Sequence, residues 1–97
     1  MKAYELLFFV APTIEDETRL AVMKRIETTI AEGEGKVDNV EDWGTRKLAY
    51  EVAGLTEGDY TLIDFHANPA NIAELDRVLR ITDAVVRHKI VRRADRD

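Results

Sequence analysis

The two histidines, His66 and His88, are the side chains of this sequence best suited to metal binding or proton transfer near neutral pH. Asp64 and His66 are two residues apart, so on a strand they would lie on the same face and offer two metal ligands. A zinc or iron site needs at least one more ligand, and no third residue has a suitable spacing. We therefore interpret both histidines as surface residues and predict neither a metal nor a cofactor.

Nucleophilic catalysis is restricted by composition, because the 97 residues include no Cys and no Ser. Only Thr, Lys, Asp or Glu remain as nucleophiles. Acidic residues are frequent, but Glu15, Asp16 and Glu17 are explained by a helix N-terminus, whose positive end favours carboxylates. No pair of carboxylates is spaced as a general acid and base. We predict that the protein is not an enzyme.

Two common ways of binding nucleotides or RNA are excluded by their missing signatures. The turn between the first strand and the first helix, residues 11–14, contains no glycine, whereas phosphate-binding loops are rich in glycine. An RNA-recognition motif needs basic and aromatic residues in its third strand, and Asp64 stands where a stacking aromatic residue is required. RNA contacts would therefore be made mainly by basic side chains to the RNA backbone.

The chain carries 14 Lys and Arg against 19 Asp and Glu, and this net charge of −5 is unevenly distributed. Residues 1–76 have a balance of −9 and residues 77–97 a balance of +4. A polyanion meets a local patch and not the average charge, so basic residues within or beside apolar strands are candidates for RNA contacts. These candidates are Lys2, Arg46, Lys47, Arg87, Lys89, Arg92 and Arg93. Each one alone is also explained as a solvated surface charge.

Hydrophobic periodicity predicts six elements in the order β-α-β-β-α-β. The predicted strands are residues 4–10, 36–52, 59–67 and 84–91, and the predicted helices follow Thr13 and Asn68. Two β-α-β halves with right-handed crossovers fold most simply into a four-stranded antiparallel sheet with two helices on one face. We predict a single α+β domain over residues 1–97 with this ferredoxin-like fold, and a loosely ordered charged tail at 92–97.

The predicted strand at 36–52 is long and contains Gly44. Before Gly44 the large apolar residues Val37 and Trp43 occupy odd positions, and after it the large apolar residues occupy even ones. Because strand side chains alternate with a period of two, one inserted residue moves the apolar set to the other face. The pattern therefore predicts a strand bent by a bulge at Gly44.

Such a sheet leaves the face opposite its helices uncovered. We expect Leu7, Phe9, Tyr60 and Leu62 on this open face, where an exposed apolar patch would mark a partner surface. One alternative is that the long hairpin folds back over the patch. Another is that the protein is a small interaction or ligand-sensing domain that dimerises through it.

The sequence also bears on cellular location. No apolar run approaches the roughly 18 residues of a membrane helix, and the first residues do not have the pattern of a secretory signal. The absence of Cys suits a reducing compartment. We predict a cytoplasmic location and no membrane partner.

Three segments of the sequence resemble one protein family. They are Trp43–Tyr50, with the sequence Trp-Gly-Thr-Arg-Lys-Leu-Ala-Tyr, Tyr4–Glu5 in the first strand, and Leu79–Arg87 at the junction of the last helix and strand. In this order and spacing they are similar to the bacterial small-subunit ribosomal protein six family. The resemblance extends over nearly the whole chain, from Tyr4 to about Arg92.

The resemblance implies a ferredoxin-like fold, no enzymatic activity and no small-molecule substrate. It implies a structural place in the platform of the small ribosomal subunit, a heterodimer with ribosomal protein eighteen, and binding of this pair to the central domain of the small-subunit rRNA. Carried over by position, Arg46 and Lys47 become candidates for RNA or partner contacts, with Arg87 and Lys2 as RNA candidates. The partner candidates are Trp43, Leu48, Tyr50, Leu7, Phe9, Tyr60 and Leu62.

Overall fold

The computed structural model describes all residues from Met1 to Asp97. The strands are β1 (Lys2–Val10), β2 (Lys36–Val52), β3 (Leu55–Ala67) and β4 (Val85–Arg92). The helices are α1 (Asp16–Glu32) and α2 (Ile72–Ile81), with short 3-10 helices η1 (Pro69–Asn71) and η2 (Ala94–Arg96). The six main elements follow the order β-α-β-β-α-β predicted from the sequence.

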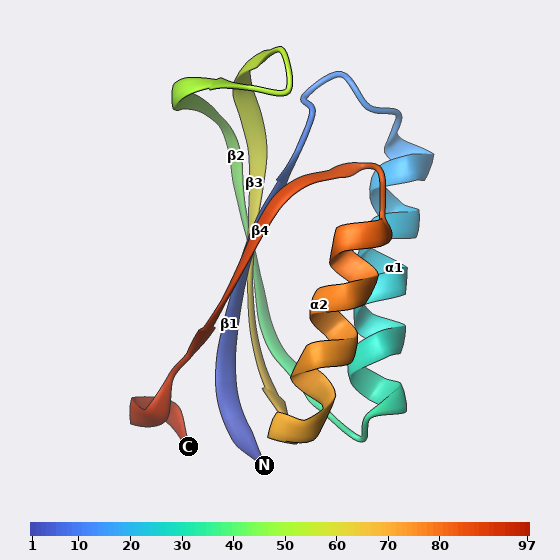
Figure 1. Cartoon of the computed structure of the whole chain (residues 1–97), viewed down its shortest axis with the longest axis vertical. Helices are drawn as coiled ribbons and strands as arrows, with labels where there is room; N and C mark the ends of the chain where they lie inside the picture. The colour runs from blue at the N-terminus through green and yellow to red at the C-terminus, as the bar shows by residue number, and fades with distance from the viewer.

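The four strands form one antiparallel sheet in the order β2-β3-β1-β4. Both helices lie on the same side of this sheet, which Figure 1 shows almost edge-on with the helices to the right. Each β-α-β unit skips one strand, so β1 and β3 are central and β2 and β4 are the edge strands. Right-handed crossovers then place both helices on the same side of the sheet. The predicted ferredoxin-like α+β fold is confirmed.

The hydrophobic core lies between the sheet and the helices. Alternate residues of β1 and β3, among them Leu6 and Phe65, point towards the helices and are 0% and 1% exposed. The helices contribute apolar side chains at helical spacing, chiefly Ile26 and Ile30 from α1 and Leu79 from α2. The remaining face of the sheet has no helix on it, and we call it the open face.

Strand β2 bends where the sequence predicts. Asp42 pairs with Thr61 and Gly44 with Tyr60, which leaves Trp43 as the extra residue of a bulge. Gly44 has φ +71°, a backbone conformation that glycine adopts without strain, and its N–H donates to the Asp42 carboxylate over 2.9 Å. The bulge turns Trp43 onto the open face.

A second bulge in β2, at Asp38, was not predicted. The pairing shifts between Val37, which lies opposite Phe65, and Asn39, which lies opposite Asp64. Val37 packs against the core, whereas Trp43 lies on the open face, so these two residues do not share a face as their odd numbers suggested. The segment 37–42 contains no glycine to mark this shift in the sequence.

The C-terminal residues differ from the loosely ordered tail that we expected. Strand β4 extends to Arg92, and residues 94–96 form η2, which lies beside the first residues of β1 (Figure 1). The Arg93 N–H donates to the Ala3 carbonyl over 2.9 Å, so the pairing of the two strands continues past the end of β4. Side-chain ion pairs hold the rest of the segment.

Candidate nucleic-acid interface

The open face carries an apolar strip along its two central strands. Leu7 pairs with Leu62 and Phe9 with Tyr60, so all four lie on the predicted side of the sheet. Phe9 and Leu62 are only 5% and 9% exposed, because neighbouring side chains of the same face cover them, and Leu7 and Tyr60 are half-buried. The patch available to a partner is therefore smaller than the sequence suggested.

Three aromatic rings form a series across this strip, from buried to exposed. Phe9 packs on Tyr60 with ring centroids 5.0 Å apart, and Tyr60 lies 6.5 Å from Trp43, which is 40% exposed. Gly58 makes room for the first ring, since a Cβ there would lie 2.5 Å from Phe9 Cδ1. Gly58 lies within β3, and only the cross-strand register reveals its packing role.

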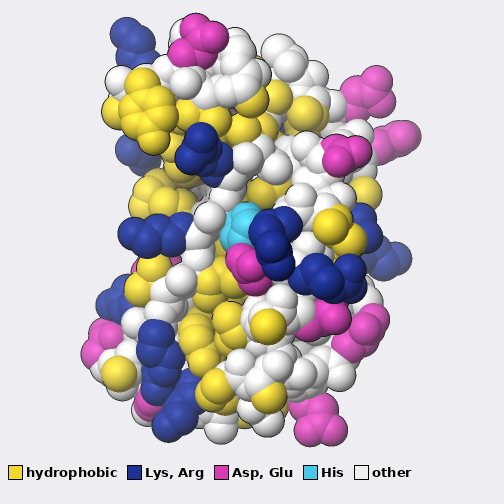
Figure 2. Space-filling model, in the orientation of Figure 1, with side chains coloured by type: hydrophobic (Ala, Val, Ile, Leu, Met, Phe, Trp, Pro, Cys, Tyr) yellow, Lys and Arg dark blue, Asp and Glu magenta, His cyan; other side chains and the backbone are white.

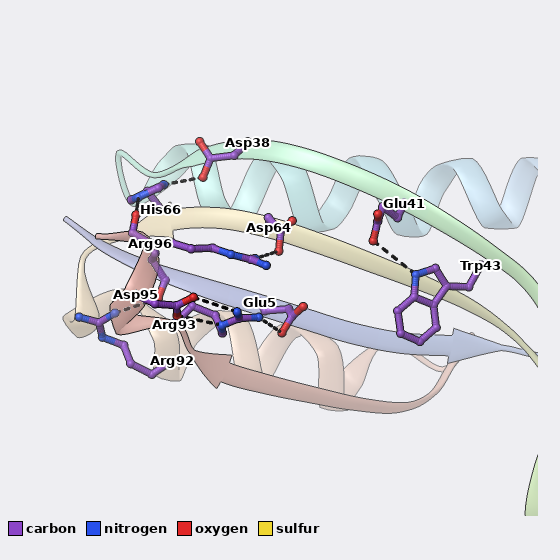
Figure 3. Close-up of polar contacts among 11 residues, drawn as sticks. Glu5, Asp38, Glu41, Trp43, Asp64, His66, Arg92, Arg93, Asp95 and Arg96 are labelled. Carbon is purple, nitrogen blue, oxygen red and sulfur yellow. Dashed lines mark hydrogen bonds and ion pairs between the residues drawn. The ribbon is translucent and has the colours of Figure 1, made fainter.

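The exposed indole of Trp43 is fixed by polar contacts from its own strand. Its Nε1–H donates to the Glu41 carboxylate over 3.4 Å, as Figure 3 shows. The Arg46 guanidinium lies 5.6 Å from the indole centroid, and Arg46 Nε–H donates to the Trp43 carbonyl over 3.2 Å. These contacts hold the ring over the open face and place a cation beside it.

Four of the predicted RNA candidates lie around the apolar strip without an ion-pair partner. Arg87 lies opposite Phe9 and Lys89 opposite Leu7 in the β1–β4 pairing, so both side chains are on the open face. Arg46 and Lys47 border the same hollow as Trp43 and Tyr60. In Figure 2, Lys and Arg side chains follow the left side of the view, where the open face lies.

The other three candidates are placed differently. Lys2 is exposed but lies at the far end of β1, bordering a hollow with Gly33 and Asn68 at the helix side of the sheet. Arg92 and Arg93 are already engaged within the chain. The structure therefore brings Arg46, Arg87 and Lys89 to the open face. Lys47 lies opposite Glu57, so strand alternation directs it to the other face, although it borders the same hollow. The remaining three candidates lie apart from this group.

The end of the chain forms a network of ion pairs, which we call the C-terminal clasp: residues 92–97 with Glu5 and Asp64 (Figure 3). Arg92 binds the Asp97 carboxylate with two N–H groups, and Asp97 also accepts the Ala3 N–H over 2.7 Å. Arg93 binds Asp95 at 3.0 Å and Glu5 at 3.1 Å, and Arg96 binds Asp64. The clasp covers one end of the open face and neutralises two of its carboxylates.

Both histidines have structural partners. His66 Nδ1 lies 2.5 Å from Asp38 and its Nε2 lies 3.2 Å from the Arg96 carbonyl, so His66 supports the clasp beside Asp64. His88 Nε2 lies 2.7 Å from Asp76, and this hydrogen bond lowers the pKa of the Asp76 carboxyl. No group of three potential metal ligands is present. The pair Asp64 and His66 thus faces the tail of the chain, a contact that no local pattern in the sequence predicts.

Acid is expected to open the clasp. The hydrogen bond from Arg92, aided by the Ala3 N–H, lowers the pKa of Asp97 from 3.8 to about 2. Since the folded pKa lies below the unfolded one, this carboxylate stabilises the clasp above about pH 4 and ceases to do so as the pH falls through 2. An NMR titration of the Asp97 carboxyl carbon should show a midpoint near 2, and the Arg92→Met variant should move it back up. A midpoint at the ordinary value in the unaltered chain would contradict the pairing.

The fold is shared with known structures. The S6 protein of the 30S ribosomal subunit from Thermotoga maritima superimposes with a TM-score of 0.89 over 97% of this chain and 89% of its own, at 39% identity. The C-terminal domain of the MgtC protein from Mycobacterium tuberculosis gives a TM-score of 0.64 at 11% identity, which shows a shared fold alone.

Sequence comparison identifies the family. The family model for ribosomal protein S6 matches residues 3–92. The small ribosomal subunit protein bS6 of Clostridium perfringens is 49% identical over 92 residues, covering 95% of this chain and 97% of the relative. That of Desulforamulus reducens is 40% identical over 95 residues, covering 98% and 100%.

The fold and these matches together define a structural protein of the small ribosomal subunit. More specifically, the chain belongs to the ribosomal protein S6 family. The resemblance drawn from the three sequence segments is thereby confirmed, as is the predicted location on the cytoplasmic ribosome. No helix of the chain is long and apolar enough to span a membrane.

Proposed function

We propose that this chain binds small-subunit rRNA, in the central domain at the platform, as a heterodimer with ribosomal protein eighteen. The observation that carries the proposal is an aromatic strip on the open face with four cations around it that form no ion pair. Cations without carboxylate partners are available to phosphates. The role is structural and non-catalytic.

RNA and the protein partner would contact different side chains. The RNA contacts fall to the four free cations, Arg46, Lys47, Arg87 and Lys89. The partner contacts fall to apolar side chains of the β2–β3 hairpin and the open face, including Tyr50, which is 68% exposed, and the half-buried Leu48. Exposed aromatic side chains are typical anchors of protein interfaces.

The charge of the chain predicts that it binds RNA weakly by itself. With a net charge of −5 and four free cations around the aromatic strip, it neutralises few phosphates and repels the others at long range. A partner that adds cations and buries exposed apolar side chains of β2 such as Tyr50 would raise the affinity. We expect the dissociation constant of a central-domain rRNA fragment to fall at least tenfold when ribosomal protein eighteen is added. An unchanged constant would refute the heterodimer.

A second candidate is a homodimer that uses the open face for protein contact. It is favoured by two large aromatic side chains of β2 that no other element covers, Trp43 and Tyr50. Analytical ultracentrifugation of the isolated chain separates the two candidates. A stable dimer at micromolar concentration supports this one, and a monomer supports the RNA-binding heterodimer.

A further inference from the structure

We propose that Trp43, Tyr60, Arg46 and Lys47 form a subsite for one unpaired RNA nucleotide, with its base on the indole ring and its phosphate on the two cations. The inference deepens the proposed function and rests on it, because it names the part of the RNA that this end of the open face would take. It assigns to RNA two aromatic residues, Trp43 and Tyr60, that the sequence placed in a protein interface.

The first argument is the support beneath the exposed ring. Phe9 is buried, Tyr60 packs on it, and Trp43 is the exposed member of the series, 6.5 Å from Tyr60 between centroids. The indole N–H also donates a long hydrogen bond of 3.4 Å to Glu41. A ring already ordered in the free protein loses little conformational entropy on binding. Stacking of a base on such a ring is worth roughly 5- to 150-fold in affinity.

The second argument is the shape of the site. Trp43, Arg46, Lys47 and Tyr60 line a hollow of about 380 Å³. Binding sites for small organic ligands have volumes of roughly 300–1,000 Å³, so a single nucleotide is of suitable size. Two of the four lining side chains are aromatic and two are cationic, which matches the flat base and the charged phosphate of one nucleotide.

The third argument is the state of the carboxylates on this face. Glu5 is paired with Arg93, Asp64 with Arg96, and Glu41 accepts the indole N–H, so each has a donor. Arg46 and Lys47, at the end of the sheet away from the clasp, have no carboxylate partner. An acidic polymer is therefore the complementary ligand for this end of the open face. The faces of a base inside a duplex are covered by the neighbouring bases, so an aromatic side chain cannot stack on it. The ligand is therefore a single-stranded segment.

The test uses Trp43 as its own reporter, since it is the one tryptophan of the chain. Titration at low salt with eight-nucleotide oligouridylate or oligoadenylate should quench the indole fluorescence and saturate. An RNA duplex with the same number of phosphates and inorganic polyphosphate should bind without comparable quenching. Absence of quenching by the single strands up to millimolar concentration, or equal quenching by polyphosphate, would overturn the subsite.

Variants separate stacking from charge. Trp43→Leu should weaken binding of a labelled oligonucleotide, followed by fluorescence anisotropy, by roughly 5- to 150-fold, whereas Trp43→Phe should retain most of the affinity. Tyr50→Leu is the matched control, because it removes an exposed aromatic residue of the same strand outside the hollow. Circular dichroism checks that each variant is folded. An equal loss in Tyr50→Leu and Trp43→Leu would overturn the assignment to this hollow.

The failure of the subsite can be told apart from failure of the proposed function. If Trp43→Leu leaves the affinity of the partner-bound chain for rRNA unchanged, the subsite is wrong and the RNA-binding function stands. If the unaltered pair does not bind the rRNA fragment, the proposed function itself fails. If Trp43→Leu weakens association with the partner in the absence of RNA while oligonucleotides do not quench the indole, the hollow belongs to the protein partner and the proposal is overturned.

Discussion

Replacing Arg87 and Lys89 together by glutamate is expected to lower the affinity of the chain and its partner for central-domain rRNA by roughly 100-fold. Each replacement removes one attraction to phosphate and adds one repulsion. About 0.7 kcal/mol for each of these four changes gives that factor. Both residues lie on the open face and neither has an ion pair, so the reversal breaks no ion pair within the protein. Binding isotherms at several salt concentrations measure the effect.

The salt dependence separates contact from general charge. Loss of two phosphate contacts should reduce the slope of log affinity against log salt concentration by about 2. The matched control is Lys24→Glu with Arg25→Glu, which makes the same change in net charge on exposed residues of α1, a helix packed on the other side of the sheet. We expect a small loss of affinity and an unchanged slope in the control. Equal losses in the two double variants would show that Arg87 and Lys89 do not contact the RNA.

Arg92 and Arg93 would behave differently from these two residues. Their guanidinium groups bind Asp97, Asp95 and Glu5, and these carboxylates raise the pKa of both arginines. A phosphate can take the place of a carboxylate only by opening the C-terminal clasp. Arg92→Ala should therefore loosen the contact between η2 and β1 and leave the affinity for RNA nearly unchanged. The loss of the clasp contacts would change the NMR signal of the Ala3 N–H, which donates to Asp97.

The fold could be predicted from the sequence because its signals are local. Apolar residues alternate along β1 and β3 and recur at helical spacing in α2, and these periods do not depend on the rest of the chain. The bend at Gly44 was predictable for the same reason, since a glycine coincides with a change in the parity of the apolar positions. At Asp38 no such residue marks the second bulge, and only the pairing with β3 reveals it.

The candidate site was predictable only in part, because its geometry depends on residues far apart in the sequence. The open-face positions of Leu7 and Tyr60 follow from alternation, but the burial of Phe9 depends on Gly58, which is 49 positions away. The clasp joins Ala3 to Asp97 across 94 positions and Glu5 to Arg93 across 88. Nothing in the local pattern of the tail indicates these partners. The net charge of the tail could therefore be predicted from the sequence, but its ion pairs could not.

Phe65→Ala is expected to lower the free energy of unfolding by about 3–5 kcal/mol. The Phe65 side chain is 1% exposed, lies at the centre of the core and stacks on Tyr4 with ring centroids 5.7 Å apart. Its removal leaves a cavity that the hydrogen-bonded strands around it cannot move together to fill. Single domains have total stabilities of roughly 5–15 kcal/mol, so the variant would be close to unfolding. Urea denaturation followed by circular dichroism measures the change.

The control is Leu20→Ala, which removes a similar apolar side chain that is 70% exposed on α1 and should change stability by no more than about 0.5 kcal/mol. A loss below about 1 kcal/mol in Phe65→Ala would contradict the packing described for the core. Phe65 points to the helix side of β3, away from the open face. At temperatures where the variant remains folded, its affinity for RNA in the presence of the partner should therefore be unchanged, because Arg46, Arg87 and Lys89 lie on the other side of the sheet.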